Sequence, residues 1–172
     1  THRFVYWVPT TWLADDVTKT ELLELLAAAH GDQCEYLSHD AARAAEQYRS
    51  GRDHLDLLRV PLIGADPALD EMGAAFLDCP DVQTRDRRGT DVGNEGENPR
   101  LAFVCDASRI CSALLLVWDR VKIRDGLLED FLRSLRARKA EAPLFLLMNK
   151  IRPERGQPTR SRRDEDLCRL MD

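Results

Sequence analysis

Two short stretches combine residue types that could take part in binding a metal ion or a polar ligand. In the first, an apolar run at residues 74–77 is followed by Asp78, Cys79, Pro80 and Asp81. In the second, an apolar run at residues 143–148 is followed by Asn149 and Lys150. An apolar run that ends abruptly in a carboxylate or an amide is typical of a buried strand that delivers a polar side chain to the rim of a sheet. A carboxylate there can hold a hard cation such as Mg²⁺, which takes oxygen ligands.

The elements that position these residues alternate between strand and helix patterns. A third apolar run, residues 113–118, lies between the first two and ends at Asp119, and a strand pattern rich in β-branched and aromatic residues covers 3–8. The runs from residue 74 onward predict parallel strands whose carboxyl ends share one edge of a sheet. The predicted fold class is therefore α/β, with a mostly parallel sheet flanked by helices.

Helical periodicity and stop signals define the connecting elements. Thr18 or Asp16 is the expected N-cap of the first helix, and Gly31 is its expected stop. Pro61 should place its strand at a sheet edge or end it early. The predicted helices cover residues 20–30, 38–49, 101–111 and 127–140, with a further one from 163, and a weaker strand covers 55–63. Residues 64–67 predict a turn and residues 85–99 a mobile polar loop, because the latter hold glycines and arginines with almost no apolar residues. The two early helices predict a helical insertion at about residues 18–50.

Composition limits the classes of protein that remain. The chain has 172 residues, 44% hydrophobic and 32% charged, which predicts one domain over 1–172. Its formal net charge of -5 argues against a surface built to bind nucleic acid. Five cysteines without a C-x-x-C pair favour reduced thiols and a cytoplasmic location, and the four histidines show no metal-ligand spacing. No apolar run approaches the length of a membrane span, and the domain looks incomplete at both ends.

The order of these stretches resembles the middle and later part of a P-loop GTPase domain, closest to the bacterial dynamin-like or Era-like branch. The residues that carry the resemblance are LDCPDVQT at 77–84, ALLLVWD at 113–119, LFLLMNK at 144–150 and, more weakly, THRFVYW at 1–7. The resemblance implies a P-loop NTPase-like fold that hydrolyses GTP with Mg²⁺ as a switch or a mechanoenzyme. GTP and Mg²⁺ are therefore the expected cofactors.

The resemblance also implies roles for single residues. Asp78 and Thr1 would lie on the metal side, Asn149 and Lys150 would hold the base, and Asp81 would stand beside the phosphates in place of the usual switch glycine. It further implies a protein partner and a homo-oligomer, leaves room for membrane association, and gives no role to nucleic acid.

Departures from the family pattern support a second interpretation. The sequence contains no G-x-x-x-x-G-K-[ST] phosphate loop, which the family places before the segment that Thr1 begins. Arg152 stands where the family has a base-reading Asp, and an arginine cannot accept hydrogen bonds from guanine. The alternative is thus a pseudo-GTPase, an interaction or scaffold domain without turnover, and a related ATPase is a third option. In the simplest alternative, Asp78 caps a turn and Asn149 and Lys150 are ordinary loop residues.

Overall fold

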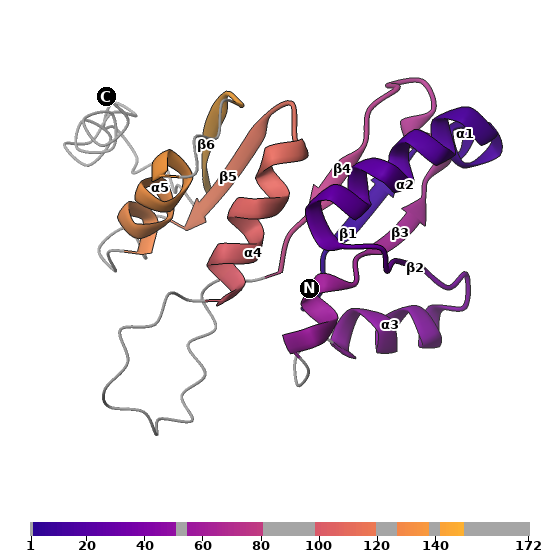
Figure 1. Ribbon diagram of the computed structural model, residues 1–172, viewed down its shortest axis with the longest axis horizontal. Helices are drawn as coiled ribbons and strands as arrows, with labels where there is room; N and C mark the ends of the chain where they lie inside the picture. Colours follow the sequence, from indigo (N-terminus) through magenta and orange to yellow (C-terminus); the bar gives the residue numbers. More distant parts are fainter. Residues whose placement is uncertain (1, 51–54, 81–98, 120–126, 138–141, 150–172) are drawn as a thin grey trace, which may run out of the picture. The chain divides into compact units, whose positions relative to one another are not determined.

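The computed structural model describes residues 2–50, 55–80, 99–119, 127–137 and 142–149 (Figure 1). The chain divides into two compact units, Thr1–Ile110 and Cys111–Asp172, and each is described by itself. Both units mix strands with helices, and most strand pairs are parallel. The predicted α/β class with a mostly parallel, helix-flanked sheet is confirmed at this level, while the single domain over 1–172 and its helical insertion stay predictions.

Unit 1 is built on a four-stranded sheet with the strand order β2-β3-β1-β4. β1 pairs in parallel with β3, and β3 pairs in parallel with β2, whereas β4 runs antiparallel to β1. The strands are β1 (Val5–Val8), β2 (Glu35–Tyr36), β3 (Leu62–Ala65) and β4 (Phe76–Asp78). The helices are α1 (Thr10–Ala14), α2 (Asp16–His30), α3 (Ala41–Ser50) and α4 (Pro99–Ala107), with the 3₁₀ turns η1 (Leu55–Arg59), η2 (Pro67–Leu69) and η3 (Ser108–Ile110).

β1 is the best-buried strand of unit 1, as its apolar sequence predicts. Phe4, Val5 and Val8 are fully buried, and Leu62 and Ile63 of β3 lie beside them. Leu22 and Leu26 of α2 are also buried. The core of unit 1 therefore forms around the β1–β3 pair, because these strands carry the β-branched and aromatic residues that fit a pleated, covered surface.

The ends of α2 and α3 follow local capping chemistry. Asp15 is the N-cap of α2, since its carboxylate accepts from the backbone N–H of Thr18 at 2.8 Å. The expected cap at Thr18 or Asp16 is therefore wrong, because the cap is the residue just before Asp16. Gly31 ends α2 with φ +92°, as predicted, and its N–H donates to the Ala27 carbonyl at 2.8 Å. Asp40, just before α3, accepts from the Arg43 N–H at 2.9 Å, and α3 begins at Ala41 rather than at the predicted residue 38.

β3 corrects the expectation that Pro61 marks an edge strand. The strand lies between β2 and β1 in the sheet, and Pro61 stands just before it. Because Pro61 lies outside β3, the N–H that proline lacks is not needed for a hydrogen bond between strands. The Pro61 carbonyl accepts from the Glu35 N–H at 3.0 Å. The segment before Pro61 forms the 3₁₀ turn η1 rather than the first half of a strand. The residues 64–67, where a turn was expected, are divided between the end of β3 and the start of η2.

β4 corrects the prediction of a buried parallel strand at residues 74–77. It begins only at Phe76, lies at the edge of the unit 1 sheet and leaves Phe76 51% exposed. Between β3 and β4 the chain reverses through η2 and a turn in which Gly73, at φ +60°, donates its N–H to the Leu69 carbonyl at 3.0 Å. A turn this short cannot carry the chain back to the start of the sheet, so β4 has to run antiparallel.

The described part of unit 2 contains a parallel pair of strands and a helix, β5 (Leu114–Asp119), α5 (Leu127–Ala137) and β6 (Leu144–Asn149), while the helix predicted from residue 163 lies outside the described residues. All three agree with the predicted elements apart from their ends. Phe131 and Leu135 of α5 are buried. On one face of the strand pair, Leu115 stands beside Phe145 and Val117 beside Leu147, and all four side chains are more than half exposed.

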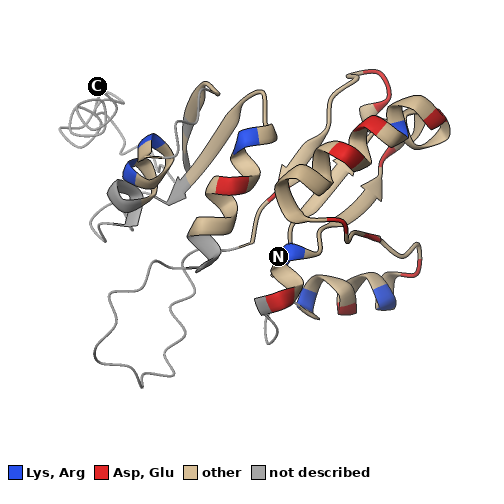
Figure 2. Ribbon diagram, viewed as in Figure 1, with Lys and Arg blue, Asp and Glu red and all other residues tan. Residues whose placement is uncertain are grey.

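The charges of unit 1 are spread over its helices. Figure 2 marks acidic residues along α2 and residues of both charges on α3. Throughout the described ranges, no helix combines the length and the apolar character that crossing a bilayer requires.

Candidate functional site

Asp78 lies at the opposite edge of the sheet from the one predicted. It is the last residue of β4 and the register partner of Val5, which is the first residue of β1. Because β4 is antiparallel, its carboxyl end reaches the edge where β1 and β3 begin. The predicted convergence of three carboxyl ends at one edge is therefore wrong for Asp78, and β5 and β6 belong to a separate sheet.

Asp78 lies at a position that is open to solvent. Asp78 is exposed, and its charge acts on Tyr48 of α3. Burial and, to a smaller extent, the Asp78 carboxylate raise the pKa of Tyr48. The backbone carbonyl of Tyr48 accepts from the His2 N–H at 3.3 Å, which joins the end of α3 to the start of the chain.

The other predicted site residues fall in different places. Thr1, Asp81 and Lys150, together with most of the predicted mobile loop at 85–99, lie outside the described residues. Asn149 is the last residue of β6, and its backbone register partner is Asp119, the last residue of β5. The structure therefore brings the ends of the ALLLVWD and LFLLMNK segments together, as the parallel pattern predicts.

A set of hydrogen bonds at the carboxyl ends of β1 and β3 was not found from the sequence. Asp70 accepts from the Thr10 hydroxyl, from the Thr11 N–H at 3.1 Å and from the Thr11 hydroxyl at 3.2 Å. These bonds, with the one from Thr10 the largest influence, lower the pKa of Asp70. Asp66, just after β3, accepts from the Ala68 N–H at 2.9 Å. Asp66 thus fastens its own turn, which the Asp66-Pro67 sequence could have indicated, whereas Asp70 ties the end of η2 to the start of α1, which no local pattern indicates.

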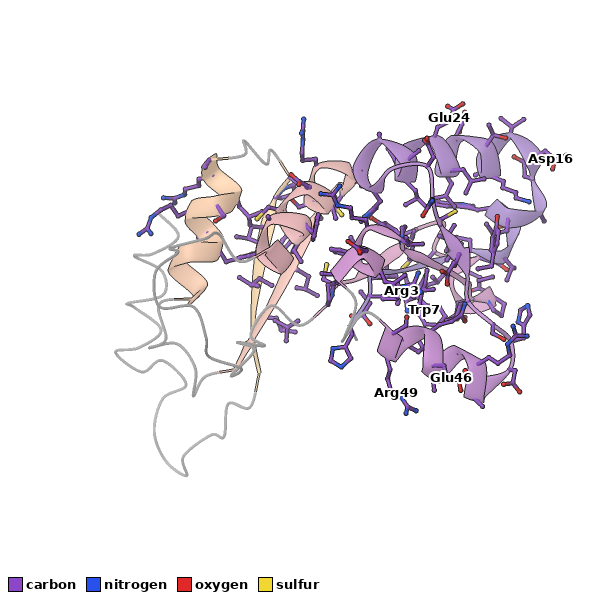
Figure 3. The ribbon with its side chains drawn as sticks, turned by 60° about the horizontal axis from the view of Figure 1, so that its bottom comes forward. Arg3, Trp7, Asp16, Glu24, Glu46 and Arg49 are labelled. Atoms are coloured by element: carbon purple, nitrogen blue, oxygen red, sulfur yellow. The ribbon has the colours of Figure 1, made fainter. Side chains whose placement is uncertain are left out.

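A buried arginine organises the opposite end of β1. Arg3 is 1% exposed, and its guanidinium donates to the Val60 carbonyl, at 3.1 Å from Nε, and to the Glu35 carboxylate at 3.0 Å. A longer contact of 3.4 Å reaches the Ser50 hydroxyl at the end of α3. Figure 3 shows Arg3 in the interior of unit 1, and Arg49 projecting outward from α3. Arg3 therefore ties β1 to β2, to α3 and to the segment before β3.

A histidine contact joins α2 to the sheet. The Tyr6 hydroxyl and His30 Nε2 are 2.7 Å apart, and the His30 ring also lies 5.0 Å from the Phe4 ring, centroid to centroid. Burial lowers the pKa of His30 to about 4, while the Asp106 carboxylate of α4 opposes that change. Sequence reasoning assigned His30 only to a helix C-terminus, and nothing in the spacing of Tyr6 and His30 indicates their contact.

The described residues do not form a ready metal site. Among them, no group of three or more His, Cys, Asp or Glu side chains is placed to hold a metal ion. Magnesium in nucleotide sites is held by one or two carboxylates together with phosphates, so Asp78 by itself does not define such a site. Burial raises the pKa of Cys34 and of Cys111, which disfavours their thiolate forms.

Comparison with known proteins returned no match to a family model, to a curated protein or to a solved structure.

Proposed function

We propose that the chain is a nucleotide-binding domain of the P-loop GTPase class, and that the carboxyl edge of β5 and β6 receives the purine base. The observation that carries this proposal is the parallel register in which Asp119 and Asn149 end neighbouring strands. Ligands of open α/β sheets bind at the carboxyl ends of parallel strands. An asparagine amide offers both a donor and an acceptor to a base, and a carboxylate offers an acceptor.

The full proposal is a switch or mechanoenzyme domain that hydrolyses GTP with Mg²⁺. In it, Lys150 covers the base, and Asp78, Thr1 and Asp81 act toward the metal ion and the phosphates. The fold class and the β5–β6 register support the base side of this proposal. The metal side rests on the resemblance of LDCPDVQT to a GTPase switch segment, because Asp78 ends an antiparallel edge strand.

Two observations favour a second candidate, an interaction domain that keeps the fold without turnover. The first is the position of Asp78 at the amino edge of β1. The second is the apolar face of β5 and β6, where the four residues Leu115, Val117, Phe145 and Leu147 are 51–64% exposed. Contiguous exposed apolar side chains mark surfaces that contact other proteins. A homo-oligomer or another protein partner is the corresponding proposal.

A titration of the 172-residue chain with a fluorescent GTP analogue and excess Mg²⁺ tests the binding proposal. We expect saturable binding with a Kd below about 1 mM, equivalent to about -4 kcal/mol. Asn149→Ala should weaken it about tenfold, which corresponds to the loss of one hydrogen bond. The matched control is Gln33→Ala, which removes an exposed amide in unit 1 and should leave the Kd unchanged.

The same samples separate the two candidates. Release of inorganic phosphate from GTP that requires Mg²⁺ and is lost in Asp78→Ala supports the hydrolase. Binding without phosphate release supports the domain without turnover. Absence of saturable binding, or an Asn149→Ala variant that binds as well as the original chain, would refute the nucleotide site.

A further inference from the structure

His30 occupies a position where one side chain joins a helix end to the central strand. Its ring packs against Phe4, which immediately precedes β1, and against Tyr6 of β1. The Phe4 centroid is 5.0 Å away with the rings tilted by 57°, and the Tyr6 centroid is 5.6 Å away with the rings at 81°. The Tyr6 hydroxyl and Nε2 of His30 are 2.7 Å apart. Phe4 and Tyr6 are themselves buried.

The contact lies at the C-terminal end of α2. His30 is the last residue of α2, and the next residue, Gly31, leaves the helix with φ +92°. Leu22 and Leu26 are the buried residues of the helix, so the final turn contributes the His30 ring and the bond from the Gly31 N–H to the Ala27 carbonyl. The His30 ring therefore holds the last turn against β1, in addition to the packing of α2 on α4 and η3.

Burial of the imidazole, rather than the groups that face it, favours the neutral form of His30. Tyr6 faces it from β1 and Asp106 faces it from α4. The Tyr6 hydroxyl can donate to Nε2 of a neutral imidazole or accept from Nε2–H of a protonated one, so this contact tolerates both forms and burial decides between them. The charged ring would also have to remain half-buried against Phe4. Burial outweighs the attraction of Asp106 and lowers the pKa of His30 to about 4.

We propose that His30 is a pH-sensitive switch, in which the neutral ring holds the C-terminal end of α2 against β1 and protonation releases that end. Protonation breaks no covalent bond and requires no other reactant. The released turn would uncover the Phe4 and Tyr6 rings, so the switch changes the surface of unit 1 in mild acid. It does not rest on the proposed base site, whose residues Asp119 and Asn149 belong to unit 2.

Amide hydrogen exchange of the whole chain, corrected for the intrinsic effect of pH, measures this release directly. We expect the protection factor of the Gly31 N–H to fall about 30-fold between pH 7.5 and pH 5, because an unfolded histidine titrates near 6.5 and the folded ring near 4. In His30→Gln, which cannot titrate, the protection factor should be the same at both pH values. His39→Gln, at an exposed position outside the contact, should behave like the original chain.

A second measurement decides the question if His30→Gln does not fold. The His30 ring protons of the original chain are followed by NMR from pH 8 to pH 3.5. Titration of this ring below pH 5, together with the loss of Gly31 protection, supports the switch. Titration above pH 6, or an unchanged protection factor of Gly31 at pH 5, overturns it.

Discussion

Asp119 and Asn149 are backbone register partners at the last positions of two neighbouring parallel strands. The relationship places the ends of two segments that are far apart in the sequence at one edge of a sheet. This edge has the geometry at which open α/β sheets bind ligands. Asp78, in contrast, ends an antiparallel strand in unit 1, opposite Val5. The base side of a nucleotide site is therefore better supported than the metal side.

Gly64 has no space for a side chain. A Cβ atom there would lie 2.7 Å from both Cε3 and Cζ3 of Trp7 and 3.3 Å from Cδ2 of Leu37. We expect Gly64→Ala to lower the free energy of unfolding by about 2 kcal/mol, because the Trp7 ring has to shift. Urea denaturation measures the loss. In a Trp7→Leu background the same substitution should cost less, and an equal cost in both backgrounds would contradict the proposed clash.

Arg3 is a polar residue whose loss should destabilise unit 1, because it is almost fully buried. Arg3→Ala removes the donors to the Val60 carbonyl and the partner of Glu35. The Glu35 carboxylate is partly exposed, so water can solvate it once Arg3 is removed, which limits the cost. We expect the free energy of unfolding to fall by about 2–3 kcal/mol. Arg49→Ala, an exposed arginine in the last turn of α3, is the control and should change it by less than about 0.5 kcal/mol. Similar losses in the two variants would contradict this role for Arg3.

His30 should make folding stability depend on pH in mild acid. Its pKa is about 4 in the folded chain, below the ordinary value of 6.5, so the unfolded chain binds the proton more readily between these values. The contribution of the neutral His30 ring to the free energy of unfolding is fully present above pH 6.5 and is lost as the pH falls toward 4. We expect the unfolding free energy to fall by about 2 kcal/mol from pH 7.5 to pH 5. His30→Gln should lack this component when both are denatured in urea, and identical pH profiles would exclude it.

The exposed apolar face of β5 and β6 should drive self-association if it is an interaction surface. We expect the chain to exceed the monomer mass in light scattering at about 100 μM, a concentration at which weak association becomes visible. Phe145→Ser and Leu147→Ser should restore the monomer. Val17→Ser, at a 66% exposed position of α2, should not. If the original chain has the monomer mass at all concentrations, the proposed homo-oligomer is wrong.

The elements that the sequence predicts well are those with a strong local pattern. β1, β5 and β6 have long apolar runs, and α2 and α3 have periodic faces with clear stops at their ends. Their confirmed positions follow from local propensity and capping. β2 was missed because Glu35 and Tyr36 are too few residues to show an alternating pattern.

The error at β4 came from a relationship that local patterns do not contain. An apolar run ending in Asp78 looks the same whether its strand is parallel or antiparallel. The number of residues that follow Ala65 carries the missing information, since a parallel return needs a crossover of a dozen or more residues and the connection from Ala65 to Phe76 is shorter. Counting that connection would have predicted the antiparallel edge strand from the sequence.

The contacts of Arg3 and His30 could not be predicted in the same way. Arg3 meets Glu35 across 32 positions of the sequence, and Tyr6 meets His30 across 24. Each side chain looks like an ordinary surface residue in the printed sequence. Their burial is decided by how α2 and α3 pack on β1, and only the tertiary structure supplies that information.

The most direct test of the central claim maps bound nucleotide onto the backbone. Amide NMR spectra of the 172-residue chain are recorded with increasing GTP and Mg²⁺, and again with inorganic phosphate and Mg²⁺ as the control. The account predicts shifts at Asp119 and Asn149 that saturate with GTP and do not occur with phosphate alone. Shifts confined to Thr10 and Thr11, at the carboxyl end of β1, or no saturable shift at Asp119 and Asn149, would contradict a base site at the edge of β5 and β6.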